Sequence, residues 1–242
     1  MKELNITKNS KLFALGVGVK NTTPKTLADL QKNDCDIIAL KFEDINDTEN
    51  LKNLLPHISK PLMVCGCGDD EVDKILLPKI MQNLDRECII SDANEQTYKE
   101  IIPYAIKGNH HIILKSPIDI NLAKELNILS VDMGLDKSKI IMNTDIGGLG
   151  YGYEYGFSIM EKVIQEGKKG DEYLEFPLFS DASGEALKTK EARSDDFSAS
   201  YGKLEERKQM VELTACAGVI AAGANIIMVN IPKNISILKG LV

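Results

Sequence analysis

Residues 62–91 read LMVCGCGDDEVDKILLPKIMQNLDRECIIS, and this stretch shows one full unit of the pattern that decides the fold. It opens on an apolar run at 62–64 and closes on another at 88–91. Between them, Val72, Ile75 and Ile80 lie close to the spacing of one helix face. The two runs are apolar on consecutive residues, as in parallel strands that are buried on both faces. The stretch therefore predicts a strand, a covering helix and the next strand.

Short apolar runs of this kind alternate with longer amphipathic stretches along the 242-residue chain. Eight runs are predicted as strands: Leu12–Val17, Ile37–Leu40, Leu62–Val64, Cys88–Ser91, His111–Leu114, Ile140–Met142, Phe176–Phe179 and Ile226–Val229. Eight strand-then-helix units favour a single (β/α)8 TIM barrel, with a doubly wound open sheet as the second choice. Because no linker divides the chain, residues 1–242 are predicted to form one TIM-barrel domain.

Two features disturb the regular alternation. Residues 181–202 are polar, carry both charge signs and lack a helical or strand period, so we expect a polar loop there. Pro78 and Pro103 fall inside predicted helices. An interior proline costs about 3 kcal/mol, so we expect these helices to be kinked or to end early.

The composition excludes several classes of protein. With 29 Lys plus Arg against 36 Asp plus Glu, the formal net charge is −7, which opposes binding to nucleic acid. No stretch approaches the roughly 18 apolar residues of a membrane helix, and the first residues lack the apolar run of a signal peptide. We therefore expect a cytoplasmic protein with no membrane partner. The odd number of cysteines, five, argues against a disulfide framework as the basis of the fold.

Polar residues gather where the predicted strands end, which is where a barrel carries its site. Asp92 and Asn94 follow the fourth strand, Ser116 follows the fifth, and Asn143 and Asp145 follow the sixth. Asp92, Asn94, Asn143 and Asp145 suit hydrogen bonding to a heterocycle such as a pterin. Asp92 and Asp145 are also candidates for an acid/base pair, and helix capping is the alternative interpretation for Asn94.

A glycine-rich run, residues 147–152, also follows the sixth strand. It contains Gly147, Gly148, Gly150, Tyr151 and Gly152, and Leu149 is the remaining residue of the run. Glycines let backbone approach a large or planar ligand, or they satisfy a turn that needs positive φ, and the run alone leaves both interpretations open. It matches neither the dinucleotide fingerprint nor a phosphate-binding P-loop.

Other reactive residues give weaker signals. Cys65 and Cys67 lie close together at a strand end, but a closed metal site needs about four ligands and no second pair completes one, so no metal is predicted. Lys115 is either a desolvated amine able to form a Schiff base or a solvated charge at the rim. His110 and His111 lie at the start of a strand, the wrong end for a barrel site.

Several ordered blocks resemble the small subunit of the corrinoid iron-sulfur protein, the delta-type subunit of the carbon monoxide dehydrogenase/acetyl-CoA synthase system. The similarity extends over about residues 60–232. Its blocks are 65–68, 94–99, 116–121, 126–129, 146–161, 184–191 and 222–225. The chain departs from the family where Asn143-Thr144-Asp145 replaces a usual Asp-Pro, and where Leu187 replaces a usual tryptophan.

The resemblance implies a barrel whose mouth, together with a large corrinoid/iron-sulfur subunit, encloses a shared cobalamin. It implies the large subunit, a methyltransferase and acetyl-CoA synthase as partners. We accordingly expect a non-catalytic subunit that caps cobalamin during methyl transfer. The cofactor contacts expected at this mouth are Asp92, Asn94, Ser116, Asn143, Asp145, Gly147, Gly148, Gly150, Tyr151 and Gly152. The alternative is a pterin-binding methyltransferase on the same barrel, with a tetrahydropterin as ligand.

Overall fold

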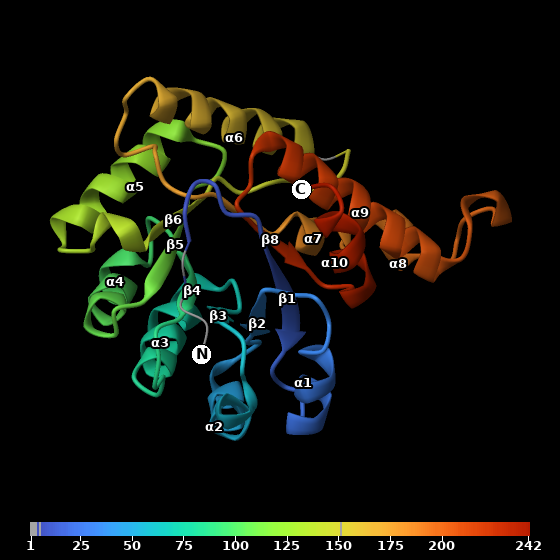
Figure 1. The fold of residues 1–242 in the computed structure, drawn as a ribbon, viewed down its shortest axis with the longest axis horizontal. Helices are drawn as coiled ribbons and strands as arrows, with labels where there is room; N and C mark the ends of the chain where they lie inside the picture. The colour runs from blue at the N-terminus through green and yellow to red at the C-terminus, as the bar shows by residue number, and fades with distance from the viewer. Residues whose placement is uncertain (1–3, 5, 151) are drawn as a thin grey trace.

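Parallel strands form a single sheet in the computed structural model, which describes residue 4, residues 6–150 and residues 152–242. Within these residues the strands are β1 (Leu12–Gly18), β2 (Ile37–Lys41), β3 (Leu62–Cys65), β4 (Ile89–Ala93), β5 (His111–Lys115), β6 (Ile140–Asn143), β7 (Phe179–Ser180) and β8 (Ile226–Val229). Their order in the sheet is β6-β5-β4-β3-β2-β1-β8-β7. Figure 1 shows the strands at the centre and the helices outside them.

The sheet nearly closes into a barrel between β6 and β7. A single bridge joins Met142 to Leu178, and the Met142 N–H donates to the Pro177 carbonyl oxygen at 2.8 Å. The predicted (β/α)8 barrel is therefore confirmed. The seventh strand differs from its predicted range, because β7 contains only Phe179 and Ser180. The residues before Phe179 contact β6 through the one bridge and do not form a continuous ladder.

Side chains of the strands fill two separate apolar layers. One layer lies inside the barrel and the other lies between the sheet and the helices. The interior layer consists of Ala14, Ile37, Ala39, Met63, Cys65, Ile89, Ile113, Ile141, Phe179, Ile226 and Met228. Because successive side chains of a strand point to opposite faces, both faces need apolar residues here. This double burial explains why the strands are apolar on consecutive positions.

The helices cover the outside of the barrel. They are α1 (Pro24–Leu30), α2 (Thr48–Leu54), α3 (Asp70–Met81), α4 (Tyr98–Lys107), α5 (Ile120–Asp132), α6 (Tyr153–Lys168), α7 (Ala182–Ala186), α8 (Lys190–Arg193), α9 (Leu204–Ala222) and α10 (Pro232–Lys239). Asp69 and Asp119 cap α3 and α5, each accepting hydrogen bonds from two backbone amides. No helix of the described residues is long and apolar enough to cross a membrane.

Both helices with an interior proline continue beyond it. α3 extends past Pro78 to Met81, and α4 extends past Pro103 to Lys107. Of the two expected outcomes, an early end is therefore contradicted, and a kink stays a prediction. Leu77, Pro78 and Ile80 are buried against the barrel. Packing of this kind supplies most of the stability of a helix inside a protein and outweighs the lost hydrogen bond.

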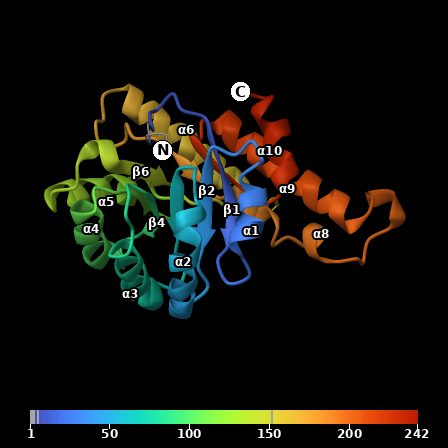
Figure 2. The same cartoon turned by 60° about the horizontal axis from the view of Figure 1, so that its bottom comes forward.

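The segment expected as a polar loop, residues 181–202, instead contains α7 and α8. Arg207 on α9 orders its second half. The buried Arg207 guanidinium donates to the carbonyl oxygens of Glu191 and Gly202, and its central carbon lies 4.9 Å from the Phe197 ring centroid. Figures 1 and 2 show α8 and the chain after it extending away from the barrel. We call residues 190–203 the arm.

Two buried histidines stand at the amino end of β5. The Cys88 N–H donates to His110 Nδ1 at 3.2 Å, which requires this nitrogen to be unprotonated. His111 Nδ1 lies 3.1 Å from Glu87 Oε1, and Lys139 pairs with the same carboxylate. Burial first, and then the positive charge of Lys139, lower the pKa of His111 to about 4. Both imidazoles are therefore neutral in the folded protein at neutral pH.

We predict that His111 makes the protein sensitive to mild acid. An unfolded histidine has a pKa of about 6.5, so between pH 6.5 and 4 the unfolded chain takes up the proton first. The contribution of neutral His111 to the free energy of unfolding is complete above pH 6.5, and it is about 2 kcal/mol smaller at pH 5. Urea unfolding at pH 7.5 and pH 5 measures this loss.

In His111→Gln the loss of unfolding free energy between these pH values should be smaller by about the same 2 kcal/mol. The control His57→Gln, at an exposed histidine, should behave as the wild type does. Equal pH dependence in His111→Gln and the wild type would contradict the assignment.

Candidate functional site

The inward-facing positions become polar at the carboxyl ends of the strands. Lys41, Ser91, Lys115 and Asn143 each stand two residues beyond an interior apolar residue of the same strand. Asp181 follows the interior Phe179 in the same way. Because inward positions recur every second residue, these side chains form the next layer of the barrel.

This polar layer surrounds a cavity of about 250 Å³, which we call the mouth cavity. Cys65, Phe179 and Met228 of the interior layer also line it. The carboxyl ends of barrel strands are where enzymes of this fold carry their sites. The mouth cavity is therefore the candidate functional site.

Charged groups of both signs line the walls of the mouth cavity. Lys41 Nζ lies 3.1 Å from Asp181 Oδ2, and Lys115 Nζ lies 3.7 Å from Asp145 Oδ2. Glu185 on α7 also lines the cavity and pairs with Lys188 at 2.5 Å. The opposite charges within these pairs nearly cancel. The cavity therefore offers hydrogen-bond donors and acceptors without a strong excess of either charge.

Asp92 is the carboxyl group whose ionisation this environment changes most. Burial raises its pKa to about 6, and the ammonium group of Lys115 acts in the opposite direction. The Asn143 amide nitrogen lies 3.5 Å from Asp92 Oδ2, at the limit of a hydrogen bond. A carboxyl group with this pKa holds or releases a proton close to neutral pH.

A tight turn after β3 forms one wall. The carboxylate of Asp73 on α3 accepts hydrogen bonds from the Cys67 and Gly68 backbone amides, each at 2.9 Å. A Cβ atom on Gly66 would lie 2.5 Å from that carboxylate, so a larger residue would displace the carboxylate from these hydrogen bonds. Burial raises the pKa of Cys65 to about 12, which keeps its thiol protonated. Cys65 thus contributes apolar lining rather than a thiolate.

A second buried carboxylate fixes the wall formed by α7. Glu212 on α9 is fully buried and accepts hydrogen bonds from Ser183 Oγ and from the backbone amides of Asn230 and Ile231. Asn234 Nδ2 donates to its other oxygen at 2.7 Å. One carboxylate therefore joins α7, the end of β8 and the start of α10.

The sequence-predicted site residues occupy different places. Asp92, Asn143 and Asp145 line the mouth cavity together. The side-chain oxygen of Asn94 accepts from the Gln96 amide, and its nitrogen donates to Asp70, so Asn94 caps the turn before α4. Ser116 is 1% exposed. Neither Asn94 nor Ser116 is among the lining residues of the cavity.

The glycine-rich run lies beside α7. A Cβ atom on Gly148 would be 3.5 Å from the Glu185 carbonyl oxygen. Gly147 and Gly148 are half-buried and Gly150 is exposed. Gly150 and Gly152 have φ of +78° and +96°, so the turn itself requires these two glycines. Tyr151 lies outside the described residues.

Four charged residues of the mouth cavity were not predicted from the sequence: Lys41, Asp181, Glu185 and Lys188. Lys41 could have been found from the strand repeat, since it follows Ala39 by two positions and therefore points inward as Ala39 does. Asp181 could be found the same way once β7 was placed. Glu185 and Lys188 reach the cavity only because α7 packs over the barrel, which sequence periodicity did not indicate.

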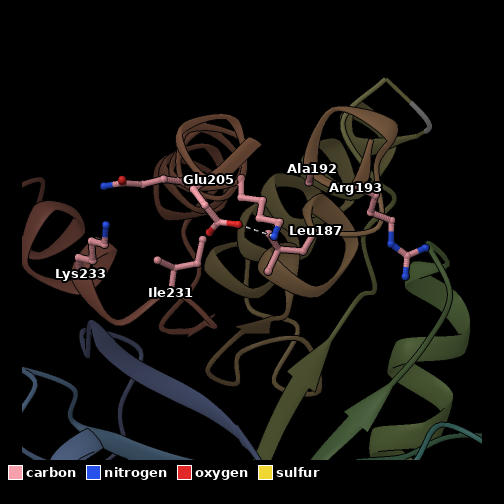
Figure 3. A pocket seen from close by; sticks show the side chains of 8 residues that line it. Leu187, Ala192, Arg193, Glu205, Ile231 and Lys233 are labelled. Atoms are coloured by element: carbon pink, nitrogen blue, oxygen red, sulfur yellow. Dashed lines mark hydrogen bonds and ion pairs between the residues drawn. The ribbon is translucent and has the colours of Figure 1, made fainter. Parts of the chain in front are cut away.

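A second hollow adjoins the mouth cavity. It has a volume of about 530 Å³, and we call it the α8–α10 cleft. Figure 3 shows its lining residues, Leu187, Ala192, Arg193, Glu205, Lys208, Gln209, Ile231 and Lys233. Leu187 lines the cleft, and its neighbour in the chain, Lys188, lines the mouth cavity. The segment between α7 and α8 therefore borders both hollows.

Comparison with known proteins identifies sequence relatives over most of the chain. The family model described as CO dehydrogenase/acetyl-CoA synthase delta subunit matches residues 25–219. The acetyl-CoA decarbonylase/synthase complex subunit delta of Methanocaldococcus jannaschii is 29% identical over 191 residues, covering 78% of this chain and 46% of that protein. The subunit of the same name from Methanopyrus kandleri is 34% identical over 134 residues, 54% of this chain and 34% of the relative. The matched region thus spans half or less of these relatives.

Solved structures with the same fold include dihydropteroate synthases. The Thermus thermophilus enzyme aligns with a TM-score of 0.66 at 10% identity, covering 96% of this chain and 94% of that one. The Yersinia pestis enzyme, solved with a pterine-sulfa conjugate, aligns with a TM-score of 0.68 at 12% identity, covering 99% and 96%. At such low identity the similarity shows the barrel fold alone.

We predict that Lys115→Met raises the pKa of Asp92 further. The Lys115 ammonium stabilises the ionised carboxylate, so its removal takes away the largest effect that opposes burial and leaves only the weaker Asn143 hydrogen bond. The measurement is a pH titration of the Asp92 carboxyl ¹³C shift, which should show a midpoint clearly above the wild-type value of about 6. Lys188→Met, which removes a cavity lysine paired with Glu185, is the control and should leave the midpoint in place. A midpoint unchanged in Lys115→Met would contradict the assignment.

Proposed function

The chain belongs to the CO dehydrogenase/acetyl-CoA synthase delta subunit family, and from this premise we propose that it is a non-catalytic barrel subunit that caps a corrinoid during methyl transfer. The corrinoid would be carried by a large corrinoid/iron-sulfur subunit and shared across the interface. A methyltransferase and acetyl-CoA synthase would be the wider partners. The names of the relatives, which are subunits of a complex, support a role within an assembly.

The shape of the mouth carries this proposal. Pockets that enclose a drug-sized ligand measure about 300–1,000 Å³. The mouth cavity, at about 250 Å³, is smaller than that, and a tetrapyrrole is larger than most drugs. A face of this kind is suited to covering a macrocycle that another subunit holds rather than to enclosing one.

The chemistry of the mouth also fits a corrinoid, whose edge carries amide side chains. Asn143 offers a matching amide, Asp145 offers an acceptor and Lys188 offers a donor, all lining the mouth cavity. The half-buried Gly147 and Gly148 add a rim without bulky side chains beside α7. These residues would hold the amide groups and exclude water from one face of the ring.

A bound corrinoid supplies a cobalt centre that accepts a methyl group and passes it on. In this proposal the chain contributes position and shielding. Asp92, with its pKa of about 6, would retain a proton part of the time at neutral pH and so act as donor or acceptor toward the ring edge. None of these roles requires a nucleophile from this chain, and the protonated thiol of Cys65 provides none.

The test is to mix the purified chain with the corrinoid-loaded large subunit. Light scattering should show a stable complex at micromolar concentrations. Because the mouth would cover the ring, the rate at which added cyanide binds the cobalt should fall at least tenfold in the complex. Absence of a complex would contradict docking, and an undiminished cyanide rate within a formed complex would contradict capping.

A second candidate function is a pterin-binding methyltransferase. The observation that favours it is the convergence of Asp92, Asn143, Asp145 and Lys115 on one small cavity, because a pterin ring presents alternating donors and acceptors. The dihydropteroate synthases show that this fold accommodates pterin-based ligands, as in the Yersinia pestis structure. In this hypothesis methyltetrahydrofolate, rather than a corrinoid, would occupy the mouth cavity.

Calorimetry with methyltetrahydrofolate separates the two candidates. If the isolated chain is the methyltransferase, it should bind with micromolar affinity, and Asp92→Ala should weaken binding at least tenfold. Asn94→Ala is the matched control, because Asn94 caps a turn outside the cavity and should not affect the affinity. No detectable heat from the wild-type chain would contradict the pterin hypothesis.

A further inference from the structure

The α8–α10 cleft has an apolar floor and a basic border. Leu187, Ala192 and Ile231 supply the apolar surface. Arg193, Lys208 and Lys233 supply positive charge against the single carboxylate of Glu205. The cleft is therefore locally basic although the whole chain carries a formal charge of −7. Figure 3 shows Arg193 and Lys233 on opposite sides of it.

These positive charges are available to an outside partner. Among the described residues, the Arg193 and Lys233 side chains take part in no hydrogen bond or ion pair. Within the part of the chain that the structure describes, Lys208 pairs with Glu205 alone, at 2.8 Å, one helical turn away. The side chain of Glu205 is 81% exposed, and an exposed pair of this kind contributes little and exchanges easily for another.

Both walls of the cleft are held in place by buried charges on α9. Arg207 hydrogen-bonds to the backbone of the arm at Glu191 and Gly202, which fixes the α8 side. Glu212 accepts from the Ile231 amide and from Asn234, which fixes the α10 side. The cleft is thus formed before anything binds, and a preformed site saves the free energy of ordering its walls.

We infer that the α8–α10 cleft docks an acidic segment of the partner subunit, which seats an apolar side chain between Leu187 and Ile231. This inference rests on the proposed function and identifies the surface that the partner contacts. Since Leu187 and Lys188 are neighbours, a segment in the cleft holds the partner against the mouth cavity. The exposed Tyr201 and the Phe197 ring, at a centroid distance of 5.6 Å, lie on the arm outside the cleft lining.

Charge reversal tests the inference in the complex with the corrinoid-loaded large subunit. Arg193→Glu combined with Lys233→Glu should weaken the complex at least tenfold and reduce its sensitivity to salt. Both residues are exposed and their side chains have no partner within the described residues, so the fold should persist. The matched control combines Lys52→Glu with Lys162→Glu, on α2 and α6, and should change the affinity less than twofold.

Photo-crosslinking identifies the occupant. A benzoylphenylalanine placed at position 209, in the cleft, should crosslink to one acidic segment of the large subunit. A complex that forms normally with the charge-reversed chain would overturn the inference and leave the proposed function standing. Crosslinks to a second copy of this chain, or none within a formed complex, would also overturn it. If the wild-type chain forms no complex, the proposed function fails and the inference fails with it.

Discussion

The two-residue repeat of the parallel strands is the constraint on which the rest of the structure depends. It directs alternate side chains into the barrel, so the same positions that build the apolar interior also build the layer above it. Phe179 and Asp181, or Ala39 and Lys41, show the change from apolar to polar within one step of the repeat. The candidate site is therefore a direct continuation of the core.

Helix α9 provides the second organising element, through two buried charges of opposite sign. Arg207 orders the arm by donating to backbone carbonyl oxygens, and Glu212 joins α7 to the start of α10 by accepting from amides and a hydroxyl. Buried charges are costly unless hydrogen bonds satisfy them, and here neutral backbone and side-chain groups do so. Together they make the region between α7 and α10 a fixed surface next to the mouth.

The barrel and part of the candidate site could be predicted from the sequence. Consecutive apolar runs predicted the strands, and Asp92, Asn143 and Asp145 were found from their position after those strands. The segment 181–202 could not be predicted, because its order comes from Glu212 and Arg207 on α9, and no local period reveals these contacts. The seventh strand was predicted to begin three residues too early for a related reason: the residues before Phe179 meet β6 through one isolated bridge at Leu178 and form no ladder. Asn94 shows the opposite case, since one polar residue after a strand served a cap rather than the cavity.

The central claim is that the polar mouth of this barrel lies over a corrinoid that a partner holds. The most direct measurement is an experimental structure of the chain bound to the corrinoid-loaded large subunit. We expect the ring to lie against the mouth, with Asn143, Asp145 and Lys188 within hydrogen-bonding distance of its edge and Gly148 beside it. A ring bound elsewhere, with the mouth facing solvent, would contradict it.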